Sequence, residues 1–441
     1  MSFDPETLIR KLRGLPAAQR YWVALSGGLD STVLLHVLAS QRGGLPGELR
    51  AVHVNHGLHA RASDWQQHCV TLCASLGVPL ECRSVKVEPA AGESLEAVAR
   101  GQRYAAFRAL LGPGDLLLLA QHQDDQMETF LLQALRGAGV RGLAAMPEVA
   151  AADGLHLARP LLDCSRAELE AWARQERLKW VEDPSNSDTG FDRNYLRHEV
   201  LPRLKARWPA AGDTLTRSAR FCAEADGLLK ELGAEDHGRY GAAETLPVRA
   251  LRELSAPRAR NLLRYWLQVR QLPMPPAHKL EEIMQQVQAR ADRNPCIEWA
   301  GAEVRRYRQR LYAQQPVAAV PREFRLRPGM AQELGEGLGV LRLMPASGEG
   351  LRAALCGPDG LAVAFRHGGE SCRPAGRGHE RPLKKWLQEL HVVPWLRDRL
   401  PLLHAEQELL AVAGLFVCEA YAASPGEPGL RIEWLEHPPL H

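Results

Sequence analysis

Short apolar runs alternate with helical patterns over the N-terminal half of the chain. Strands that alternate with helices indicate βαβ units and a parallel sheet, and strands that are apolar throughout indicate a sheet covered on both faces. We therefore predict an α/β fold in which a doubly wound parallel sheet forms the first domain, at residues 1–212. The predicted strands cover residues 21–25, 49–54, 78–87 and 116–120.

Different patterns follow in the rest of the chain. Residues 213–315 have mainly helical patterns, which predict a helical domain. Residues 316–350 are rich in Pro, Gly and Ala, with short apolar pieces, so we expect a linker that carries some strand. Residues 351–441 combine strand-like runs with a helical stretch near residues 381–390, which predicts a small α+β domain at the C-terminus.

The composition narrows the class of protein. The 441 residues are 45% hydrophobic and 24% charged, which is typical of a soluble globular protein with roughly two to four domains. No apolar run approaches the ~20 residues that a membrane helix needs, and the first residues lack the apolar core of a secretion signal. The nine cysteines include no Cys-x-x-Cys pair, and their odd number argues against a complete disulfide framework. We therefore expect a reduced, cytoplasmic protein that contacts no membrane.

The string Ser-Gly-Gly-Leu-Asp-Ser follows the first predicted strand and opens a helix. Its glycines let backbone N–H groups approach an anion, and the helix start adds unpaired N–H groups and the positive end of the dipole. The string is neither a Walker loop nor a Gly-x-Gly-x-x-Gly turn, and an ordinary glycine-rich turn is the alternative. In this context we expect a phosphate or pyrophosphate ligand, with Asp30 as a candidate Mg²⁺ ligand. The loop residues are Ser26, Gly27, Gly28, Leu29, Asp30 and Ser31.

Polar residues also follow two other predicted strands of the same sheet. His53 lies at the end of the second strand, where a histidine is often structural. Asp124, Asp125 and Glu128 open the helix after residues 116–120, with Asp124 and Glu128 on one helical face. Alone, these acids would be a solvated first turn. Since doubly wound sheets bind ligands at the carboxyl ends of their strands, the glycine-rich loop favours a magnesium or amine site here.

Together, these strings resemble those of the tRNA(Ile)-lysidine synthases. The loop resembles the pyrophosphatase-type loop of ATP enzymes that release AMP and pyrophosphate. The resemblance extends from about residue 21 to the C-terminus and is most specific in the N-terminal domain. The matching strings are residues 26–31, 53–58, 120–129, 136–143, 159–162, 180–188, 193–197, 365–370, 383–386 and 393–397.

This resemblance implies an ATP-dependent ligase that acts on an isoleucine tRNA with a CAU anticodon. The C2 oxygen of the wobble cytidine would be adenylated, and the ε-amine of free L-lysine would then displace AMP. The products would be lysidine, AMP and pyrophosphate, and the implied cofactors are ATP and Mg²⁺. The helical domain would bind substrate, and the C-terminal domain at residues 351–441 would bind the tRNA.

The resemblance also implies roles for single residues. The loop at residues 26–31 and His53 would bind ATP, and Asp30 and Asp125 would hold Mg²⁺. The catalytic residues would be Asp30, Asp125 and Glu128. Asp125 and Glu128 would hold the lysine ammonium and accept its proton, because freeing that amine at pH 7 costs roughly 4–5 kcal/mol.

Basic residues gather in a few segments, although the net charge is only +3. Between Arg366 and Arg399, eight Lys or Arg stand against four Asp or Glu. Such a patch is most often ordinary surface, but a polyanionic substrate favours contact with phosphates, which position RNA without reading its sequence. The predicted RNA-binding residues are Arg193, Asn194, Arg197, Lys384 and Lys385.

Two other functions remain open at this point. One is a different AMP-releasing tRNA-modifying enzyme with the same loop, such as a tRNA thiolase or an amide-forming synthetase. Thiolases of this kind use paired cysteines, and the sequence has no Cys-x-x-Cys. The other is a non-catalytic RNA-binding protein, which would leave the phosphate loop unexplained.

Overall fold

The structure is a computed structural model of the chain. It describes residues 3–15, 17–90, 95–152, 154–241, 244–288, 295–316, 320, 322–335, 337–406 and 408–441. The chain divides into two compact units, Met1–Leu228 and Leu229–His441. Within the described ranges, no helix has the length and apolar character needed to cross a membrane.

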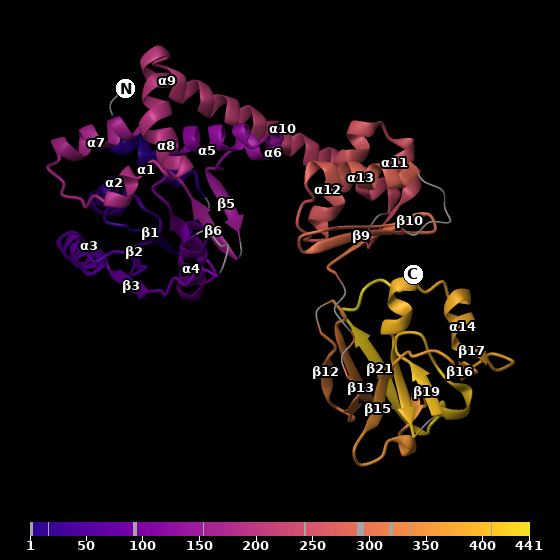
Figure 1. Ribbon diagram of the computed structural model, residues 1–441. Coiled ribbons are helices and arrows are strands. Elements are labelled where there is room, and N and C mark those ends of the chain that lie inside the picture. The colour runs from indigo at the N-terminus through magenta and orange to yellow at the C-terminus, as the bar shows by residue number, and fades with distance from the viewer. Residues whose placement is uncertain are drawn as a thin grey trace. The chain divides into compact units, whose positions relative to one another are not determined.

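A six-stranded sheet forms the centre of the first unit (Figure 1). Its strand order is β3-β2-β1-β4-β6-β5, and all neighbours are parallel except β5 and β6. The prediction of a parallel sheet is confirmed, and the structure adds the short β5–β6 hairpin at its edge. The strands are β1 (Arg20–Ala24), β2 (Glu48–Asn55), β3 (Leu80–Ser84), β4 (Asp115–Leu118), β5 (Val149–Ala152) and β6 (Leu155–Ala158).

Successive residues of β1 pack into two separate hydrophobic cores. Tyr21 and Val23 pack with residues of α1, α2, α3 and α7, whereas Trp22 packs with Phe107 of α4. Since side chains alternate between the faces of a strand, a strand that is apolar throughout needs cover on both sides. The sheet is therefore doubly wound, as predicted. The helices are α1 (Pro5–Arg13), α2 (Leu29–Ser40), α3 (Ala62–Leu76), α4 (Leu95–Leu110) and α7 (Arg166–Gln175).

The order of the strands brings two loops together at one edge of the sheet. β1 lies between β2 and β4, so the chain runs outward from β1 in both directions. Val23 pairs with Leu118, and therefore β1 and β4 end side by side. Open α/β sheets bind ligands outside the carboxyl ends of their strands where the order reverses. The loops that follow β1 and β4 lie at this position.

Further helices of the first unit pack on α5. Met127 of α5 forms a small core with Leu201 of α9 and Ala211 of α10. This packing brings the segment before α9 alongside α5. The elements are α5 (Gln123–Leu135), α6 (Val140–Leu143), the 3₁₀ helix η2 (Pro184–Ser187), α8 (Asp192–Tyr195), the π-helix η3 (Leu196–Val200), α9 (Leu201–Arg207) and α10 (Ala211–Tyr240), which continues into the second unit.

The second unit begins with helices and a four-stranded antiparallel sheet of order β7-β10-β9-β8. The helices are predicted by the pattern, but the sheet is not. Its strands are short, and β9 buries the charged residues Glu303 and Arg306, which hides the expected alternation. The elements are β7 (Thr245–Pro247), α11 (Val248–Glu253), α12 (Ala256–Val269), α13 (Ala277–Gln288), β8 (Cys296–Trp299), β9 (Ala302–Tyr307) and β10 (Arg310–Gln314).

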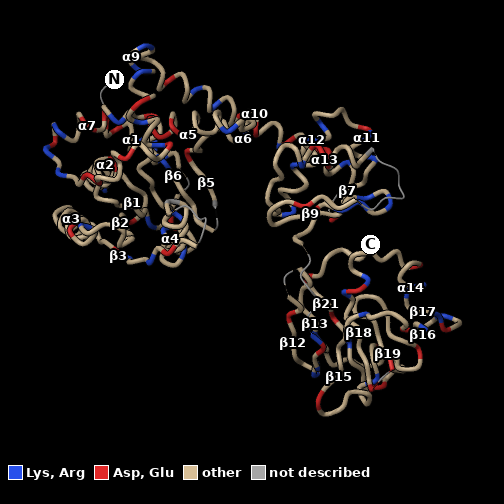
Figure 2. Tube along the Cα trace, viewed as in Figure 1, with Lys and Arg blue, Asp and Glu red and all other residues tan. Residues whose placement is uncertain are grey.

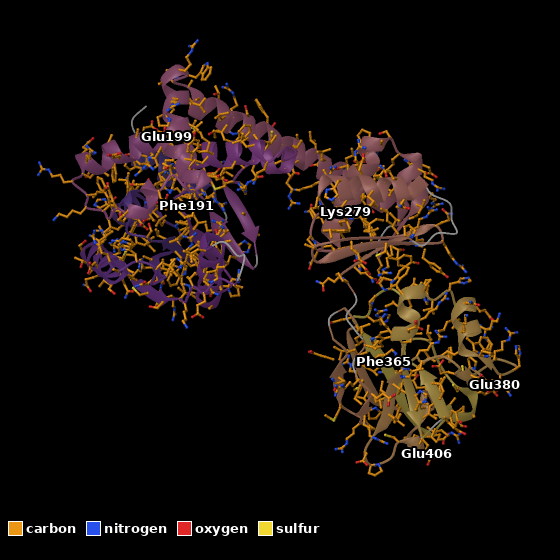
Figure 3. All side chains as sticks on the ribbon, in the orientation of Figure 1. Phe191, Glu199, Lys279, Phe365, Glu380 and Glu406 are labelled. Atoms are coloured by element: carbon orange, nitrogen blue, oxygen red, sulfur yellow. The ribbon has the colours of Figure 1, made fainter. Side chains whose placement is uncertain are left out.

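Two antiparallel sheets form the C-terminal part, with orders β11-β15-β18-β19-β20 and β12-β13-β21-β14. A two-stranded sheet, β16-β17, lies near α14, where Figure 2 shows several basic residues. Phe365 lies among the strands, whereas Glu380 and Glu406 lie at the periphery (Figure 3). The elements are β11 (Phe324–Leu326), β12 (Ala331–Glu333), β13 (Val340–Ser347), β14 (Leu351–Arg352), β15 (Leu361–Phe365), β16 (Ser371–Cys372), β17 (Arg381–Pro382), α14 (Leu383–Glu389), β18 (Pro401–Ala405), β19 (Glu408–Val412), β20 (Phe416–Val417) and β21 (Pro428–Leu435).

Residues 316–350, the expected linker, carry strand as predicted. β11 pairs with β15, and β13 pairs with β21 over eight residue pairs. These pairings attach β11, β12 and β13 to the C-terminal sheets. The domain bounds drawn from the sequence stay a prediction.

Candidate active site

The loop between β1 and α2 leaves the first N–H groups of the helix available to an anion. Gly28 is the N-cap of α2, and no side chain caps this helix. Gly27 has a φ of +83°, and a Cβ there would lie 3.0 Å from Cys69 Sγ and 3.2 Å from Val181 Cγ2. Both the conformation and the space therefore favour glycine. Because the first N–H groups of a helix have no intrahelical acceptor, this loop fits a phosphate.

Two hydroxyl groups set the shape of the loop. The Oγ atoms of Ser26 and Ser31 are 3.0 Å apart. Gly28 N donates to Ser26 Oγ at 3.2 Å, and Ser31 Oγ donates to Gly28 O at 3.2 Å. The predicted loop residues therefore form one hydrogen-bonded turn at the start of α2.

Asp30 meets the loop after β4 because the two strands are neighbours. His122 Nε2 lies 3.6 Å from Asp30 Oδ1 and 3.5 Å from Asp125 Oδ2. Asp30 Oδ1 is buried and has no hydrogen-bond partner among the residues that the structure describes. Burial raises the pKa of Asp30, while His122 lowers it and Asp125 raises it. Two carboxylates, one with an unpartnered oxygen, are the kind of donors that Mg²⁺ binds.

The buried carboxylate of Glu128 binds two arginines. Arg193 Nε lies 2.6 Å from Glu128 Oε2, and Arg197 Nε lies 2.7 Å from Glu128 Oε1. The Nη2 atoms of the same arginines lie 3.3 and 3.2 Å from Asp125 Oδ1. Two carboxylates and two guanidinium groups therefore form a charge-balanced cluster beside Asp30. Arg197 lies in the π-helix η3, and short π-helical segments are frequent at functional sites.

Arg193, Arg197 and Glu128 form contacts with one another that the sequence does not predict. Arg193 and Arg197 are 34% and 23% exposed and bind carboxylates of α5. Whether they also contact RNA stays a prediction. Oε2 of Glu128 accepts hydrogen bonds from both arginines and Oε1 from one, and whether Glu128 also holds the lysine ammonium stays a prediction.

His53 and Asn194 both hold loop backbone at this edge of the sheet. His53 Nδ1 lies 2.8 Å from Leu25 O. Burial lowers the pKa of His53, so its ring is neutral at pH 7 and donates this bond from Nδ1. Asn194 Nδ2 donates to Ser185 O at 3.0 Å and to Asp188 O at 2.8 Å. Both residues lie where the loops of the site are anchored, and their predicted contacts with ATP and RNA stay predictions.

The sequence patterns predict no role for His122 or Lys205. Asp124 accepts hydrogen bonds from Lys205 Nζ and from Arg166 N, the latter at 2.8 Å, and so joins α5 to α9 and α7. Burial would raise the pKa of Asp124, but Lys205 and the Arg166 amide outweigh it and hold the pKa below its usual value. The position of His122, directly before the acidic residues of α5, is a sequence signal that could have indicated a role for it. Lys205 has none, because it lies 81 residues from Asp124 in the sequence.

The predicted basic residues of the second unit lie around α14. Lys384 and Lys385 are exposed and form no ion pair within the described part of the chain. Arg377 and Arg381 instead pair with Glu389, at 3.2 and 3.3 Å. The two lysines are therefore the members of this group whose charge is least compensated locally.

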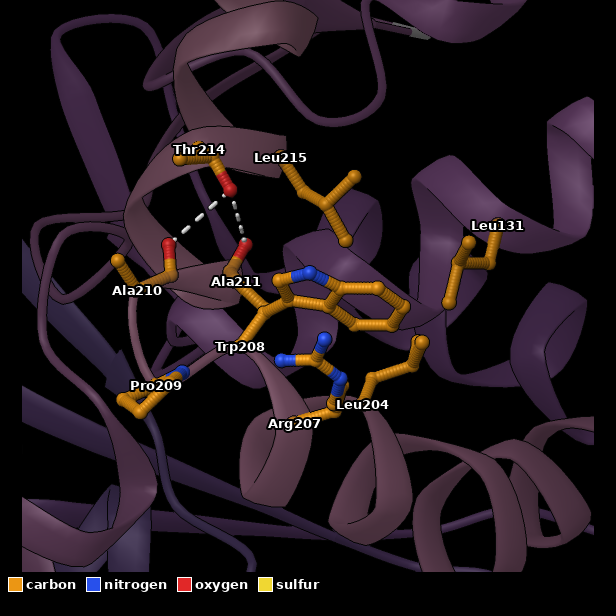
Figure 4. A pocket seen from close by; sticks show the side chains of 9 residues that line it. All are labelled: Leu131, Leu204, Arg207, Trp208, Pro209, Ala210, Ala211, Thr214 and Leu215. Atoms are coloured by element: carbon orange, nitrogen blue, oxygen red, sulfur yellow. Dashed lines mark hydrogen bonds between the residues drawn. The ribbon is translucent and has the colours of Figure 1, made fainter.

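A cavity of ≈ 530 Å³ lies elsewhere in the first unit, between α5, α9 and α10 (Figure 4). Its lining is mainly apolar, with Leu131, Leu204 and Leu215 around the indole of Trp208. None of its lining residues is acidic, and its one cation is Arg207 beside that indole. The polar groups at the carboxyl edge of the sheet, and not this cavity, therefore form the candidate active site.

Three family models match the chain in the order of its parts. A PP-loop domain matches residues 5–204. A TilS substrate binding domain matches residues 246–312, and a TilS substrate C-terminal domain matches residues 361–434. Together they include the phosphate loop, the acidic residues of α5 and the basic residues of α14.

Curated relatives match almost from end to end. The tRNA(Ile)-lysidine synthase of Alkalilimnicola ehrlichii is 43% identical over 99% of this chain and 98% of its own length. The enzyme of the same name from Coxiella burnetii is 39% identical over 98% of this chain and 96% of its own length. That from Escherichia coli O157:H7 is 41% identical over 96% and 98%. At this identity and coverage, the chain belongs to the tRNA(Ile)-lysidine synthase family.

Proposed function

We propose that this chain joins lysine to C2 of the wobble cytidine of an isoleucine tRNA with a CAU anticodon, using ATP. The observation that carries this proposal is membership of the family over 99% of the chain at 43% identity. The loop at the start of α2 supports it, because uncapped N–H groups suit a triphosphate.

The reaction has two steps. First, the C2 oxygen of cytidine attacks the α-phosphorus of ATP, a P–O bond to the β-phosphate breaks, and pyrophosphate leaves. The base then carries AMP on that oxygen, which makes a poor leaving group a good one. In the second step the ε-nitrogen of lysine bonds to C2, the C2–O bond breaks, and AMP leaves with the oxygen. The amine loses the proton that made it an ammonium and one more on forming the new bond.

Asp30 and Asp125 are the residues that would hold Mg²⁺ here. The unpartnered, buried Oδ1 of Asp30 supports this role, as does the position of Asp125 across His122 from it. A bound Mg²⁺ would stabilise negative charge on the phosphates. Both carboxylates lie next to the start of α2, where the phosphates of ATP would sit.

The protein also has to accept a proton from lysine. Asp125 is the candidate acceptor, since it lies between His122 and the two arginines at the end of β4. Glu128 acts through others: it fixes the guanidinium groups of Arg193 and Arg197, which in turn orient Asp125. We therefore assign Glu128 as a positioning residue, because guanidinium groups bind both of its oxygens and make it a weak base, whereas they bind only Oδ1 of Asp125.

The test is to incubate the full chain with ATP, labelled lysine and the isoleucine tRNA, and then to digest the tRNA. A lysine-bearing nucleoside, with AMP and pyrophosphate as nucleotide products, is the expected result. An isoleucine tRNA without a wobble cytidine serves as the control and should remain unlabelled. ADP as the main product, or no labelled nucleoside, would contradict the proposal.

A second AMP-releasing chemistry, sulfur transfer to tRNA, has less support. Cys69 and Cys73 are the cysteines nearest to each other along the chain, and burial raises the pKa of each to about 12. They are therefore thiols at neutral pH, whereas sulfur transfer uses thiolates.

A further inference from the structure

Arg159 is a buried cation at the carboxyl edge of the sheet. It directly follows β6 and is 6% exposed. Its Nη1 donates to Pro147 O at 2.8 Å, and its Nε donates to Gln121 Oε1 at 2.9 Å. Both acceptors are neutral. Arg159 forms no ion pair with an acid among the described residues.

A buried guanidinium without an acidic partner has a large desolvation cost that no nearby negative charge offsets. Removing an ion from water costs several kcal/mol, even after the protein relaxes around it. Arg193 and Arg197 at the same edge meet this cost with Asp125 and Glu128. Burial lowers the pKa of Arg159, as does the charge of Arg100. Arg159 has only dipoles around it, and a second cation lies close by.

That second cation and an aromatic ring come from α4. The guanidinium carbon of Arg100 lies 5.0 Å from the ring centre of Tyr104, and Arg100 Nη2 donates to the Tyr104 hydroxyl at 3.4 Å. The Tyr104 hydroxyl also interacts with Arg159. Tyr104 therefore links a buried guanidinium to an exposed one. Arg100 forms no ion pair with a described acid either.

We propose that Arg159 and Arg100 form a subsite for a phosphate of the RNA backbone beside the nucleotide that is modified. The subsite rests on the proposed tRNA substrate. Its missing counter-charge is an anion, and a phosphodiester matches the planar fork of an arginine. Arg100 covers one face of the Tyr104 ring, so the tyrosine contributes its hydroxyl, which accepts from Arg100 Nη2 and can donate its proton to the phosphate.

The order of the strands distinguishes this phosphate from those of ATP. ATP phosphates would bind at α2, which follows β1, whereas Arg159 follows β6, two strands away. Neighbouring strands are about 4.8 Å apart, so the two positions are separated by about 10 Å. Asp125 follows β4, the strand between them. The edge therefore carries, in order, a triphosphate site, the reacting carboxylates and the proposed RNA phosphate site.

The test uses the full chain and a fluorescent anticodon stem-loop of the isoleucine tRNA as the probe. Affinity is measured by anisotropy over a range of salt concentrations for Arg100→Gln and Arg159→Lys. Each variant should bind the probe roughly three- to tenfold more weakly. For Arg100→Gln, the slope of log K against log salt should become shallower by about 0.7, as expected for one lost contact with single-stranded RNA. Arg159→Lys keeps the charge but not the fork, so its slope should stay closer to that of the unchanged chain.

Arg50→Gln is the matched control. Arg50 also lies on an aromatic ring, 5.5 Å from the centre of Trp22, but near the start of β2 at the opposite edge of the sheet. Its loss should leave the slope unchanged. Affinity for ATP, measured in parallel, should change less than twofold in every variant.

Two results would overturn the subsite. If Arg100→Gln leaves the slope as it is, Arg159 only fastens the β5–β6 hairpin through Pro147. If ATP affinity falls while the probe still binds, the phosphate belongs to the nucleotide. Lysine incorporation by the unchanged chain is measured separately. If the unchanged chain makes the lysine-bearing nucleoside but Arg100→Gln leaves the salt slope unchanged, the subsite is wrong and the proposed function stands. If the slope changes but no lysine-bearing nucleoside forms, the proposed function is wrong and the arginines still bind RNA.

Discussion

Arginines at the carboxyl edge of the sheet have opposite electrostatic surroundings. Arg193 and Arg197 are paired with Asp125 and Glu128, so their charge is balanced inside the protein. Arg159 is more deeply buried and has only neutral partners. Balanced arginines can fix the geometry of the acids that they hold. An unbalanced one is better suited to receive an anion, because the ligand then supplies the charge that the fold omits.

The largest expected effect is loss of the balanced cluster. Glu128→Gln leaves the guanidinium groups of Arg193 and Arg197, which are 34% and 23% exposed, short of one charge. Because these cations are partly solvated, the free energy of unfolding should fall by roughly 3 kcal/mol, the lower end for a broken buried pair. The melting temperature should then fall by roughly 6–12 °C, given about 2–4 °C per kcal/mol for a unit of this size. Calorimetry of the full chain measures the shift.

The control for this variant is an exposed pair on the same unit. Glu199 lies 3.4 Å from Arg203, and their side chains are 47% and 82% exposed. Glu199→Gln should therefore cost less than about 1 kcal/mol. Equal shifts for Glu128→Gln and Glu199→Gln would show that the buried cluster does not hold the arginines.

The second effect concerns turnover and not stability. Asp30→Asn removes a carboxylate whose Oδ1 has no described hydrogen-bond partner, so folding should lose little. AMP release with tRNA present should fall at least about 100-fold, which corresponds to roughly 2.7 kcal/mol. Product separation and circular dichroism measure the two quantities. Asp64→Asn on α3, an exposed position, should leave both unchanged, and near-normal AMP release by Asp30→Asn would remove this carboxylate from the mechanism.

Local patterns predict the parts of this site that depend on local chemistry. The apolar runs and the Ser-Gly-Gly-Leu-Asp-Ser string place the loop and α2 correctly, because strand burial and helix starts are read from neighbouring residues. The partners of Glu128 are not readable in this way. Arg193 lies 65 residues away, and its helical spacing from Arg197 equally fits an exposed RNA-binding face. Only the packing of α9 and α10 on α5 shows that the two arginines turn inward.

The β5–β6 hairpin and the burial of Arg159 also cannot be predicted from local sequence patterns. A strand of four residues such as β6 gives too short a pattern to distinguish from a loop. The string at residues 159–162 supports the family resemblance but says nothing about the burial of Arg159. Its neutral partners, Gln121 and Pro147, come from loops that meet it only in the folded sheet.

A third prediction separates the two phosphate positions. Gly27→Ala forces a side chain into a backbone with φ of +83° and to within 3.0 Å of Cys69 Sγ. Strain of this kind costs roughly 1–3 kcal/mol, so the loop should shift to relieve it. Its backbone N–H groups would then no longer face the phosphates, and ATP affinity should fall about tenfold. Affinity for the anticodon stem-loop should stay within twofold of the unchanged chain, because its proposed phosphate lies at β6. Equal losses for both ligands would mean that the two phosphate sites are one.

The smallest effect extends the comparison to the second unit. Lys384 and Lys385 have no described acidic partner, whereas Arg377 and Arg381 share Glu389. An unpaired cation releases a counterion when it meets a phosphate, and a paired one first has to leave its carboxylate. With whole tRNA as the ligand, the double change Lys384→Gln and Lys385→Gln should therefore make the salt slope shallower by about 1.4–1.8, or about 0.7–0.9 per contact.

The double change Arg377→Gln and Arg381→Gln removes the same number of charges and is the matched control, with a smaller expected slope change. ATP affinity should stay unchanged in both variants, because the phosphate loop lies in the first unit. If both pairs of changes alter the slope equally, local pairing does not decide which cations meet the tRNA. The proposal that the unpaired Arg159 binds a phosphate would then depend on the measurements with the anticodon stem-loop alone. If neither pair alters the slope, the basic residues of α14 are ordinary surface.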